Sequence, residues 1–237
     1  MTTLALDTCF GACSVAVTWR APTSGGPGGG VFRCETLARG HAERLLPMIA
    51  EAMAEAPFAI MDLERIAVTT GPGTFTGQRV GLAAARALAL ATGARIAPLS
   101  SLVAMAHTAR AQLGPEASAV PLAVAVDARR GEVYFEVVGA GPAPVASGPS
   151  LVTPLAAAAL LAERGDVAMV VGSGARAVAE AAALQGLSLD ARLPDLQPDM
   201  RFVPLDGLVF SDLPPKPLYL RPPDAKPQDG KSLARAP

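Results

Sequence analysis

The residues whose types and spacing could most directly do chemistry lie in the glycine-rich stretch from Gly71 to Gly81. This stretch joins an apolar segment at 65–69, expected to be a strand, to a segment at 76–92 that is expected to be a helix. Backbone N–H groups at the start of a helix can bind a phosphate, and glycines let another surface approach closely. The spacing matches neither a P-loop, because no Gly-Lys-Ser/Thr follows, nor a dinucleotide-binding turn. The stretch is therefore either a phosphate-binding loop or a turn that packs tightly on a neighbouring element.

A stripe of small side chains runs along the helix expected at 76–92. Its members recur at three- and four-residue spacing, which places them on one side of the helix: Gly77, Gly81, Ala84, Ala85 and Leu88. Such a side allows another helix axis to come close, either between chains or within this chain. A second helix, expected at 41–55, carries leucine, isoleucine and methionine on one side and mostly charged residues on the other.

Length and composition indicate a folded protein. The 237 residues suit one large domain or two small ones, and 51% of them are hydrophobic, which excludes disorder throughout. A formal net charge of -1 gives no global attraction for a polyanion, so the chain alone is a poor candidate for binding RNA. Cys9, Cys13 and Cys34 lack metal-ligand spacing and are expected to be buried thiols in a reducing compartment. With no secretory or membrane-spanning pattern, the sequence predicts a cytoplasmic protein.

The order of the expected elements repeats along the chain. Three strands within 3–38 precede the helix at 41–55, and the strand at 65–69, the glycine turn and the helix at 76–92 follow. A similar series of hairpin, helix, strand, glycine turn and helix occupies 122–184. We therefore predict an α/β fold of two duplicated domains, 1–100 and 101–221, and a loose tail at 222–237.

The first hairpin and the later motifs resemble known families. The Asp7-Thr8 turn after the first strand is similar to that of the actin, heat-shock chaperone ATPase and sugar kinase superfamily. Taken in order, the other motifs resemble the bacterial TsaB family, also called YeaZ. They are His-Ala-Glu-Arg-Leu-Leu-Pro from His41, the glycine-rich stretch from Gly71, Asp-Ala-Arg-Arg-Gly-Glu-Val-Tyr from Asp127, and Pro-Leu-Tyr-Leu-Arg from Pro217. They span nearly the whole chain.

This resemblance implies a two-domain, actin-like fold and a role as the non-catalytic partner of TsaD. TsaD transfers a threonylcarbamoyl group to the adenosine beside the anticodon of ANN-decoding tRNAs. TsaE and ATP are further components that the resemblance implies, with tRNA bound through the complex and a metal ion held by a partner subunit. Relatives usually have a helix before the final Tyr-Leu-Arg, whereas no strong helix is expected here at 188–217, so the domain at 101–221 is expected to be partly trimmed.

Catalytic equipment is expected to be absent from this chain. TsaD-like proteins hold a metal with a His-x-x-x-His pair, and at that place this sequence has Ser101 and Met105, which are poor ligands. The only histidines, His41 and His107, are far apart, and His41 is expected to cap or pack rather than act as a general base. We expect no metal and no firmly bound cofactor. A degenerate nucleotide cleft is expected at Asp7, Thr8, Gly71, Gly73 and Asp127, where Asp127 also belongs to a turn with Arg129 and Glu132.

The two helices are then expected to carry the distinctive surface. We predict that they contact TsaD or a second copy of this chain in competing assemblies, and that Arg79 binds an acidic group across the interface. A bulky residue at Gly81 or Ala85 is expected to block association and leave the fold intact. The expected interface residues are His41, Leu45, Leu46, Ile49, Met53, Gly77, Arg79, Gly81, Ala84, Ala85 and Leu88. An ATP-dependent phosphotransferase of the sugar kinase superfamily, or a metallopeptidase-like protein, is the alternative class.

Overall fold

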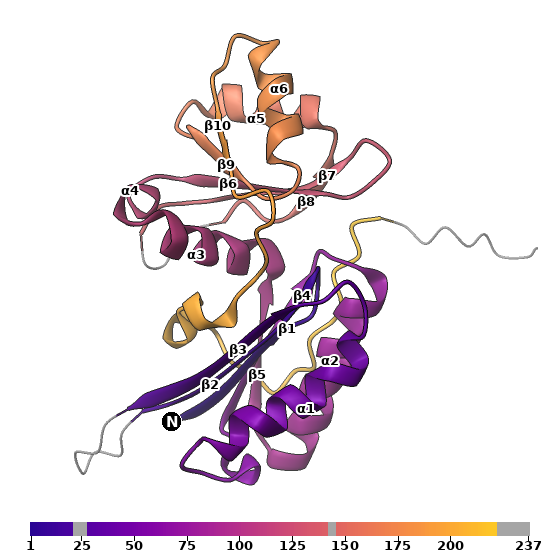
Figure 1. Cartoon of the computed structure of the whole chain (residues 1–237), viewed down its shortest axis with the longest axis vertical. Helices are drawn as coiled ribbons and strands as arrows, with labels where there is room; N and C mark the ends of the chain where they lie inside the picture. The colour runs from indigo at the N-terminus through magenta and orange to yellow at the C-terminus, as the bar shows by residue number, and fades with distance from the viewer. Residues whose placement is uncertain (21–27, 142–145, 222–237) are drawn as a thin grey trace, which may run out of the picture.

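Two five-stranded sheets form the two lobes of the computed structural model, which describes residues 1–20, 28–141 and 146–221 (Figure 1). The strands of the first sheet lie in the order β3 (Gly29–Thr36), β2 (Ala12–Trp19), β1 (Thr2–Asp7), β4 (Arg65–Gly71) and β5 (Arg95–Ser100). The first three strands in the chain pair antiparallel, as a meander; β4 then pairs with β1 and β5 with β4, both in parallel.

The second sheet has the same strand arrangement as the first sheet. Its order is β8 (Ser150–Val152), β7 (Val133–Val138), β6 (Leu122–Asp127), β9 (Met169–Val171) and β10 (Asp190–Arg192). Again three strands pair antiparallel and the last two add in parallel. This confirms the predicted α/β class and the internal duplication, in which β6 is the counterpart of β1. The short edge strands β8 and β10 were not predicted.

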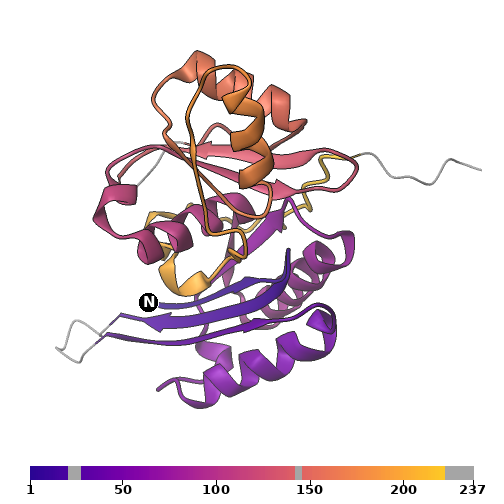
Figure 2. The same cartoon turned by 45° about the horizontal axis from the view of Figure 1, so that its top comes forward.

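Helices cover the outer face of each sheet. Over the first sheet lie α1 (His41–Ala54) and α2 (Phe75–Thr92), and over the second lie α5 (Pro154–Arg164) and α6 (Ala175–Ala183). Between the two sheets lies α3 (Ser101–Leu113), as the turned view shows (Figure 2). The remaining helical elements are α4 (Pro115–Ser118) and the 3₁₀ turns η1 (Ile60–Asp62), η2 (Met200–Phe202) and η3 (Leu205–Gly207).

Side chains of different size cover the two faces of the first sheet. Leu4 and Leu6 pack against α1 and α2, while the intervening Ala5 points to the inner face, as strand periodicity requires. Four alanines are direct register neighbours across the inner face: Ala16, Ala5, Ala67 and Ala97. Because this row is flat, Met200, Val203 and Phe210 can pack closely on it.

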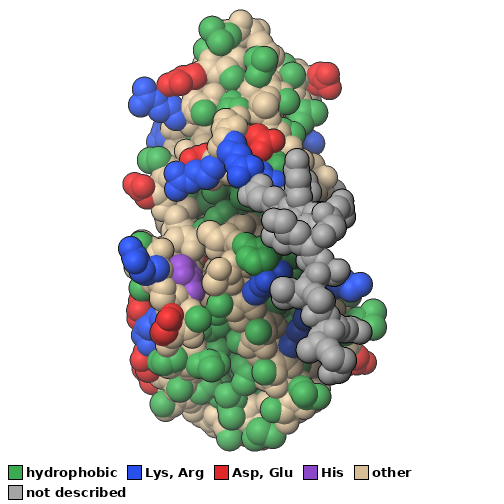
Figure 3. Space-filling view, turned by 90° about the vertical axis from the view of Figure 1, so that its right-hand side faces the viewer, with side chains coloured by type: hydrophobic (Ala, Val, Ile, Leu, Met, Phe, Trp, Pro, Cys, Tyr) green, Lys and Arg blue, Asp and Glu red, His purple; other side chains and the backbone are tan. Residues whose placement is uncertain are grey.

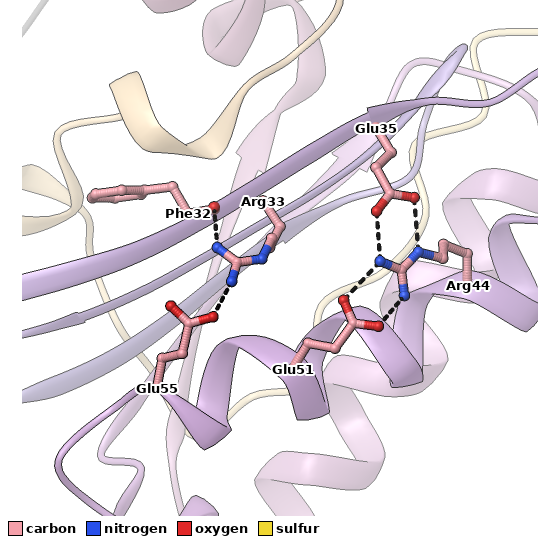
Figure 4. A network of polar contacts seen from close by, with 6 residues as sticks. All are labelled: Phe32, Arg33, Glu35, Arg44, Glu51 and Glu55. Carbon is pink, nitrogen blue, oxygen red and sulfur yellow. Dashed lines mark hydrogen bonds and ion pairs between the residues drawn. The ribbon is translucent and has the colours of Figure 1, made fainter.

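An arginine-centred network joins α1 to the edge strand β3 (Figure 4). Arg44 donates to both carboxylate oxygens of Glu35 and to both of Glu51, and a separate pair joins Arg33 to Glu55. These bonds from Arg44 lower the pKa of Glu35 and of Glu51. The network holds the α1 flank that faces β3, so that flank is charged rather than apolar.

The chain returns to the first lobe after β10. Although 101–221 is predicted to be one domain, Met200, Val203 and Phe210 pack on the first sheet. Ser211 also exchanges backbone hydrogen bonds with Ile96 of β5. The sequence shows no helical period here because this segment is a series of turns that covers an alanine surface. The predicted tail at 222–237 lies outside the described residues.

A C-terminal segment, 211–221, which we call the strap, then runs beside α2 to the second lobe. Arg86 of α2 donates through Nε to the carbonyl of Pro215 (3.1 Å), and the Leu218 N–H donates to the carbonyl of Thr70 (2.8 Å). At its end the Arg221 guanidinium bonds to Glu132 (2.5 Å) and to the carbonyl of Ala128 (3.0 Å). The strap therefore joins the two lobes, in agreement with its path in Figure 1.

Replacing Arg221 by Met is expected to lower the free energy of unfolding by about 1–2 kcal/mol, because a half-buried carboxylate and a carbonyl lose their donor. Urea unfolding followed by circular dichroism measures the change. Arg176→Met is the matched control, because Arg176 forms an exposed pair with Glu180 inside one helix. Equal stability of the two variants would show that the Arg221 contacts do not hold the lobes together.

Candidate functional site

Asp7 lies at the end of β1, beneath the junction of the lobes, and is 0% exposed. Its Oδ1 accepts hydrogen bonds from the Thr69 hydroxyl (2.5 Å) and from the Cys9 N–H (3.3 Å), and its Oδ2 has no partner among the described residues. Burial raises the pKa of Asp7 to about 6, and the hydrogen bonds from Thr69 and Cys9 oppose this shift. Asp7 is thus a buried carboxyl with one oxygen that accepts no hydrogen bond from the described residues.

The glycine turn is what covers Asp7 and Thr8. The Thr74 N–H donates to the Cys9 carbonyl (2.8 Å), and a Cβ on Gly73 or Gly77 would collide with the carbonyl of Cys9 or of Thr8. One side of the turn therefore packs closely on the backbone of Thr8 and Cys9, while residues 73–77 also line the cleft described below. Of the two interpretations of this stretch, the packing turn fits the structure, and α2 begins with Thr74 as its N-cap.

Asp127, the counterpart of Asp7 at the end of β6, is exposed. It accepts a hydrogen bond from the Arg129 N–H (2.8 Å), the Asx-type contact expected of a turn residue. Three successive residues at 129–131 have positive φ. Within this turn Glu132 pairs with Arg221, and an Arg129 guanidinium nitrogen lies 4.0 Å from a carboxylate oxygen of Asp127.

A cleft of about 780 Å³ lies between the lobes, beside these turns. The first turns of α1 and α2 form one wall, and the end of β6, Tyr134 and Leu196 form the other. Gly73 and Asp127 line it, whereas Asp7, Thr8 and Gly71 do not. The cleft therefore brings together two of the five residues predicted for it, and the covered Asp7 does not reach it. His41 lies in this wall just after Gly40, which takes the N-cap position, so His41 is not the cap.

No three His, Cys, Asp or Glu side chains come together as a metal-ligand set in the part of the chain that the structure describes. Ser101 is buried and donates to the carbonyl of Pro72 (2.5 Å), and Met105 is buried in the core between α3 and the second sheet. Both side chains therefore have structural contacts within this chain. The predicted lack of a metal and of a firmly bound cofactor stays a prediction.

The inner sides of α1 and α2 belong to the core of this chain, which corrects part of the predicted interface. A Cβ on Gly81 would lie 2.7 Å from Thr8 Oγ1, so the small-residue stripe fits the turn after β1 rather than a partner. The predicted interface residues that are buried in this way are Leu45, Ile49, Met53, Gly77, Gly81 and Ala85. A bulky residue at Gly81 or Ala85 would therefore disturb the fold, contrary to the expectation from sequence.

The outer sides of the same helices form a surface that we call the alanine face. Its exposed side chains are Leu46, Pro47, Ala50 and Ala54 on α1 and Ala83, Ala87 and Leu90 on α2. Leu46 is 58% exposed and Leu90 is 89% exposed. Figure 3 shows hydrophobic side chains over the lower part of this side of the molecule, with few charges among them. Of the predicted interface residues, Leu46 and Arg79 are exposed here, and His41, Ala84 and Leu88 are half-buried.

The sequence held a signal for this outer side. Ala83, Ala87 and Leu90 recur at four- and three-residue spacing, as the inner stripe does. Because alanine occurs on both sides of α2, periodicity alone does not say which side meets the sheet. Among the described residues no helix combines the length and apolar character needed to cross a membrane.

Comparison with known proteins agrees with this architecture. The family model for TsaD, tRNA N6-adenosine threonylcarbamoyltransferase, matches residues 23–140. YeaZ from Pseudomonas aeruginosa superposes with a TM-score of 0.70 at 27% identity, over 92% of this chain and 99% of that one. TsaB of Haemophilus influenzae is 38% identical over 138 residues, 58% of this chain and 54% of that protein. An uncharacterised protein of Mycobacterium tuberculosis is 35% identical over 190 residues, 80% of this chain and 79% of that protein.

The duplicated sheets, the helix pair on each outer face and the cleft between the lobes define an actin-like protein of the TsaD class. Within that class the chain belongs to the TsaB (YeaZ) family. The alignment spans about half the length of the H. influenzae TsaB protein that it matches.

Proposed function

We propose that this chain acts in the biosynthesis of threonylcarbamoyladenosine in tRNA, as a non-catalytic subunit that binds and activates a TsaD-type transferase through its alanine face. The observation that carries the proposal is the exposure of this face on a helix pair whose opposite side is fixed in the core. Contiguous apolar side chains on a folded surface are typical of protein contacts.

Relatedness to TsaD supports the choice of partner. The match to the TsaD family model, 23–140, includes both α1 and α2, so a TsaD protein has counterparts of these helices. Two related helix pairs can meet about a pseudo-two-fold axis and form a four-helix contact. Small side chains such as Ala83 and Ala87 let the helix axes approach closely. A second copy of this chain would use the same face, so self-association and binding to TsaD would compete.

The environment of Asp7 supports a non-catalytic role. The carboxyl that lies after the first strand is covered by the glycine turn and does not line the cleft. In the proposed complex the ATP and the metal ion belong to the partner subunits, TsaE takes part with TsaD, and tRNA binds through the assembly. This chain then contributes an apolar surface rather than reacting groups.

Replacing Ala87 by Glu is expected to weaken binding to the TsaD protein of the same organism by at least about 100-fold, because the contact would bury a carboxylate without a partner. Isothermal titration calorimetry measures the affinity, and threonylcarbamoyl transfer to tRNA with and without the subunit measures activation. Ala177→Glu, an exposed alanine on α6, the counterpart of α2 in the second lobe, is the matched control and should bind normally. Normal binding and activation by the Ala87 variant would contradict the proposal.

A further inference from the structure

An exposed aromatic and cationic stack lies where the strap passes the start of α2. The Arg79 guanidinium carbon lies 3.5 Å from the ring centre of Phe75, and Arg79 Nε donates to the Tyr219 hydroxyl (2.7 Å). The rings of Phe75 and Tyr219 are stacked with their centres 5.5 Å apart. Residues 140 positions apart in the sequence therefore form one surface cluster.

The stack is fixed but remains accessible. Phe75 is 57% exposed and Tyr219 is 43% exposed. The strap holds Tyr219 in place from both sides, through the Leu218 N–H on Thr70 and the Arg221 guanidinium on Glu132. Side chains that are already ordered lose little conformational entropy when a partner binds.

Arg79 has no carboxylate partner among the described residues, in contrast to Arg44, Arg176 and Arg221. Its Nε donates a hydrogen bond to the Tyr219 hydroxyl, and one face of its guanidinium packs on the Phe75 ring. These contacts fix the orientation of the group without neutralising its charge. An oriented guanidinium that has no carboxylate partner within 1–20, 28–141 and 146–221 is suited to a carboxylate, which it can bind through two N–H groups.

We infer that the strap is a third strip of the partner surface, beside α1 and α2, and that the stack of Phe75, Arg79 and Tyr219 binds a carboxylate side chain of the TsaD-type subunit. This inference rests on the proposed function. Continuity supports it, because Arg79 lies one helical turn before Ala83, on the same side of α2 as the alanine face. Tyrosine and arginine are also the residue types that most often dominate binding energy at interfaces.

Three variants test the inference against the transferase subunit. Arg79→Met keeps the length that packs on Phe75 and removes the charge, so the dissociation constant should rise about 30-fold. Arg79→Lys keeps the charge without the planar guanidinium, so its dissociation constant should lie between those of Arg79→Met and the native chain. Tyr219→Ala, which leaves Arg79 less ordered, should weaken binding about tenfold. The affinity of the native chain should fall between 50 and 500 mM NaCl, and that of Arg79→Met should change less.

Arg176→Met, at an exposed pair on the other lobe, is the control and should bind like the native chain. Thermal unfolding of each variant separates loss of binding from loss of fold, and Tyr219→Phe, which removes only the hydroxyl, provides a second test if Tyr219→Ala unfolds. Native affinity and native salt dependence of Arg79→Met, while Ala87→Glu abolishes binding, would overturn this inference alone. If Ala87→Glu also binds normally, the proposed function fails. The inference would also be overturned if Arg79→Met weakened the self-association of this chain but left its binding to the transferase unchanged.

Discussion

Replacing Gly77 by Ala is expected to destabilise the protein by about 3 kcal/mol, although the same change in an ordinary helix is stabilising. The reason is the contact between α2 and the turn after β1. The added methyl group would collide with the carbonyl of Thr8, and the Thr8 hydroxyl already donates to the Gly77 carbonyl (2.6 Å). Neither backbone can move without separating the helix from the sheet. Urea unfolding followed by circular dichroism measures the effect.

Gly207→Ala is the matched control for this change. Nothing lies within 4 Å of a Cβ built on Gly207, and it belongs to an exposed 3₁₀ turn, so its stability should change by less than about 0.5 kcal/mol. If Gly77→Ala proves as stable as the native protein, the small-residue stripe does not serve the intramolecular contact.

The order of the elements could be predicted from the sequence because each has a strong local signal. Short apolar runs mark β1 and β6, and Thr153 before Pro154 marks the start of α5, where the Thr153 hydroxyl does accept the Ala156 N–H (3.2 Å). The repeat of these signals indicated the duplication. In contrast, β8 and β10 have three residues each, which is too short for a period to be visible.

The orientation of the helices could not be predicted with the same means. Ala85 is buried and Ala83 is exposed, yet both are alanines within one turn of α2. A helical period identifies two sides of such a helix but gives no hydrophobic contrast between them. The sheet side is decided by tertiary contacts, such as that of Gly81 with Thr8, which sequence spacing does not contain.

Contacts between distant parts of the chain could not be predicted from the sequence either. Arg221 and Glu132 are 89 residues apart, and Arg79 and Tyr219 are 140 apart. The motifs that contain them could be singled out, and Arg79 could be expected at an interface, but no local pattern links them. The burial of Asp7 belongs to the same class, because it depends on the glycine turn packing on the Asp7-Thr8 turn.

Asp7 makes the stability of this protein depend on pH in a direction opposite to that of most carboxylates. Burial raises its pKa from 3.8 to about 6, so between these values the native state keeps a proton that the unfolded state has lost. The contribution of Asp7 to stability is therefore fully present below about pH 4, is lost as the pH rises to about 6, and stays lost above that. A shift of this size corresponds to about 3 kcal/mol, at about 1.4 kcal/mol for each pH unit.

Asp7→Asn is accordingly expected to raise the free energy of unfolding at pH 8 by about 1 kcal/mol, since a neutral amide avoids the cost of the buried charge but puts an NH2 group where Oδ2 has no partner among the described residues. Its stability should also change less than that of the native chain between pH 4 and 6, which urea unfolding at a series of pH values measures. Asp127→Asn, the exposed counterpart at the end of β6, is the control and should keep the native pH profile. Because Asp7 lies beneath the glycine turn and away from the alanine face, the Asn variant should bind the transferase normally. Identical pH profiles for Asp7→Asn and the native chain would show that Asp7 is ionised at no cost, and the carboxyl would then have to be solvated or paired in the folded protein.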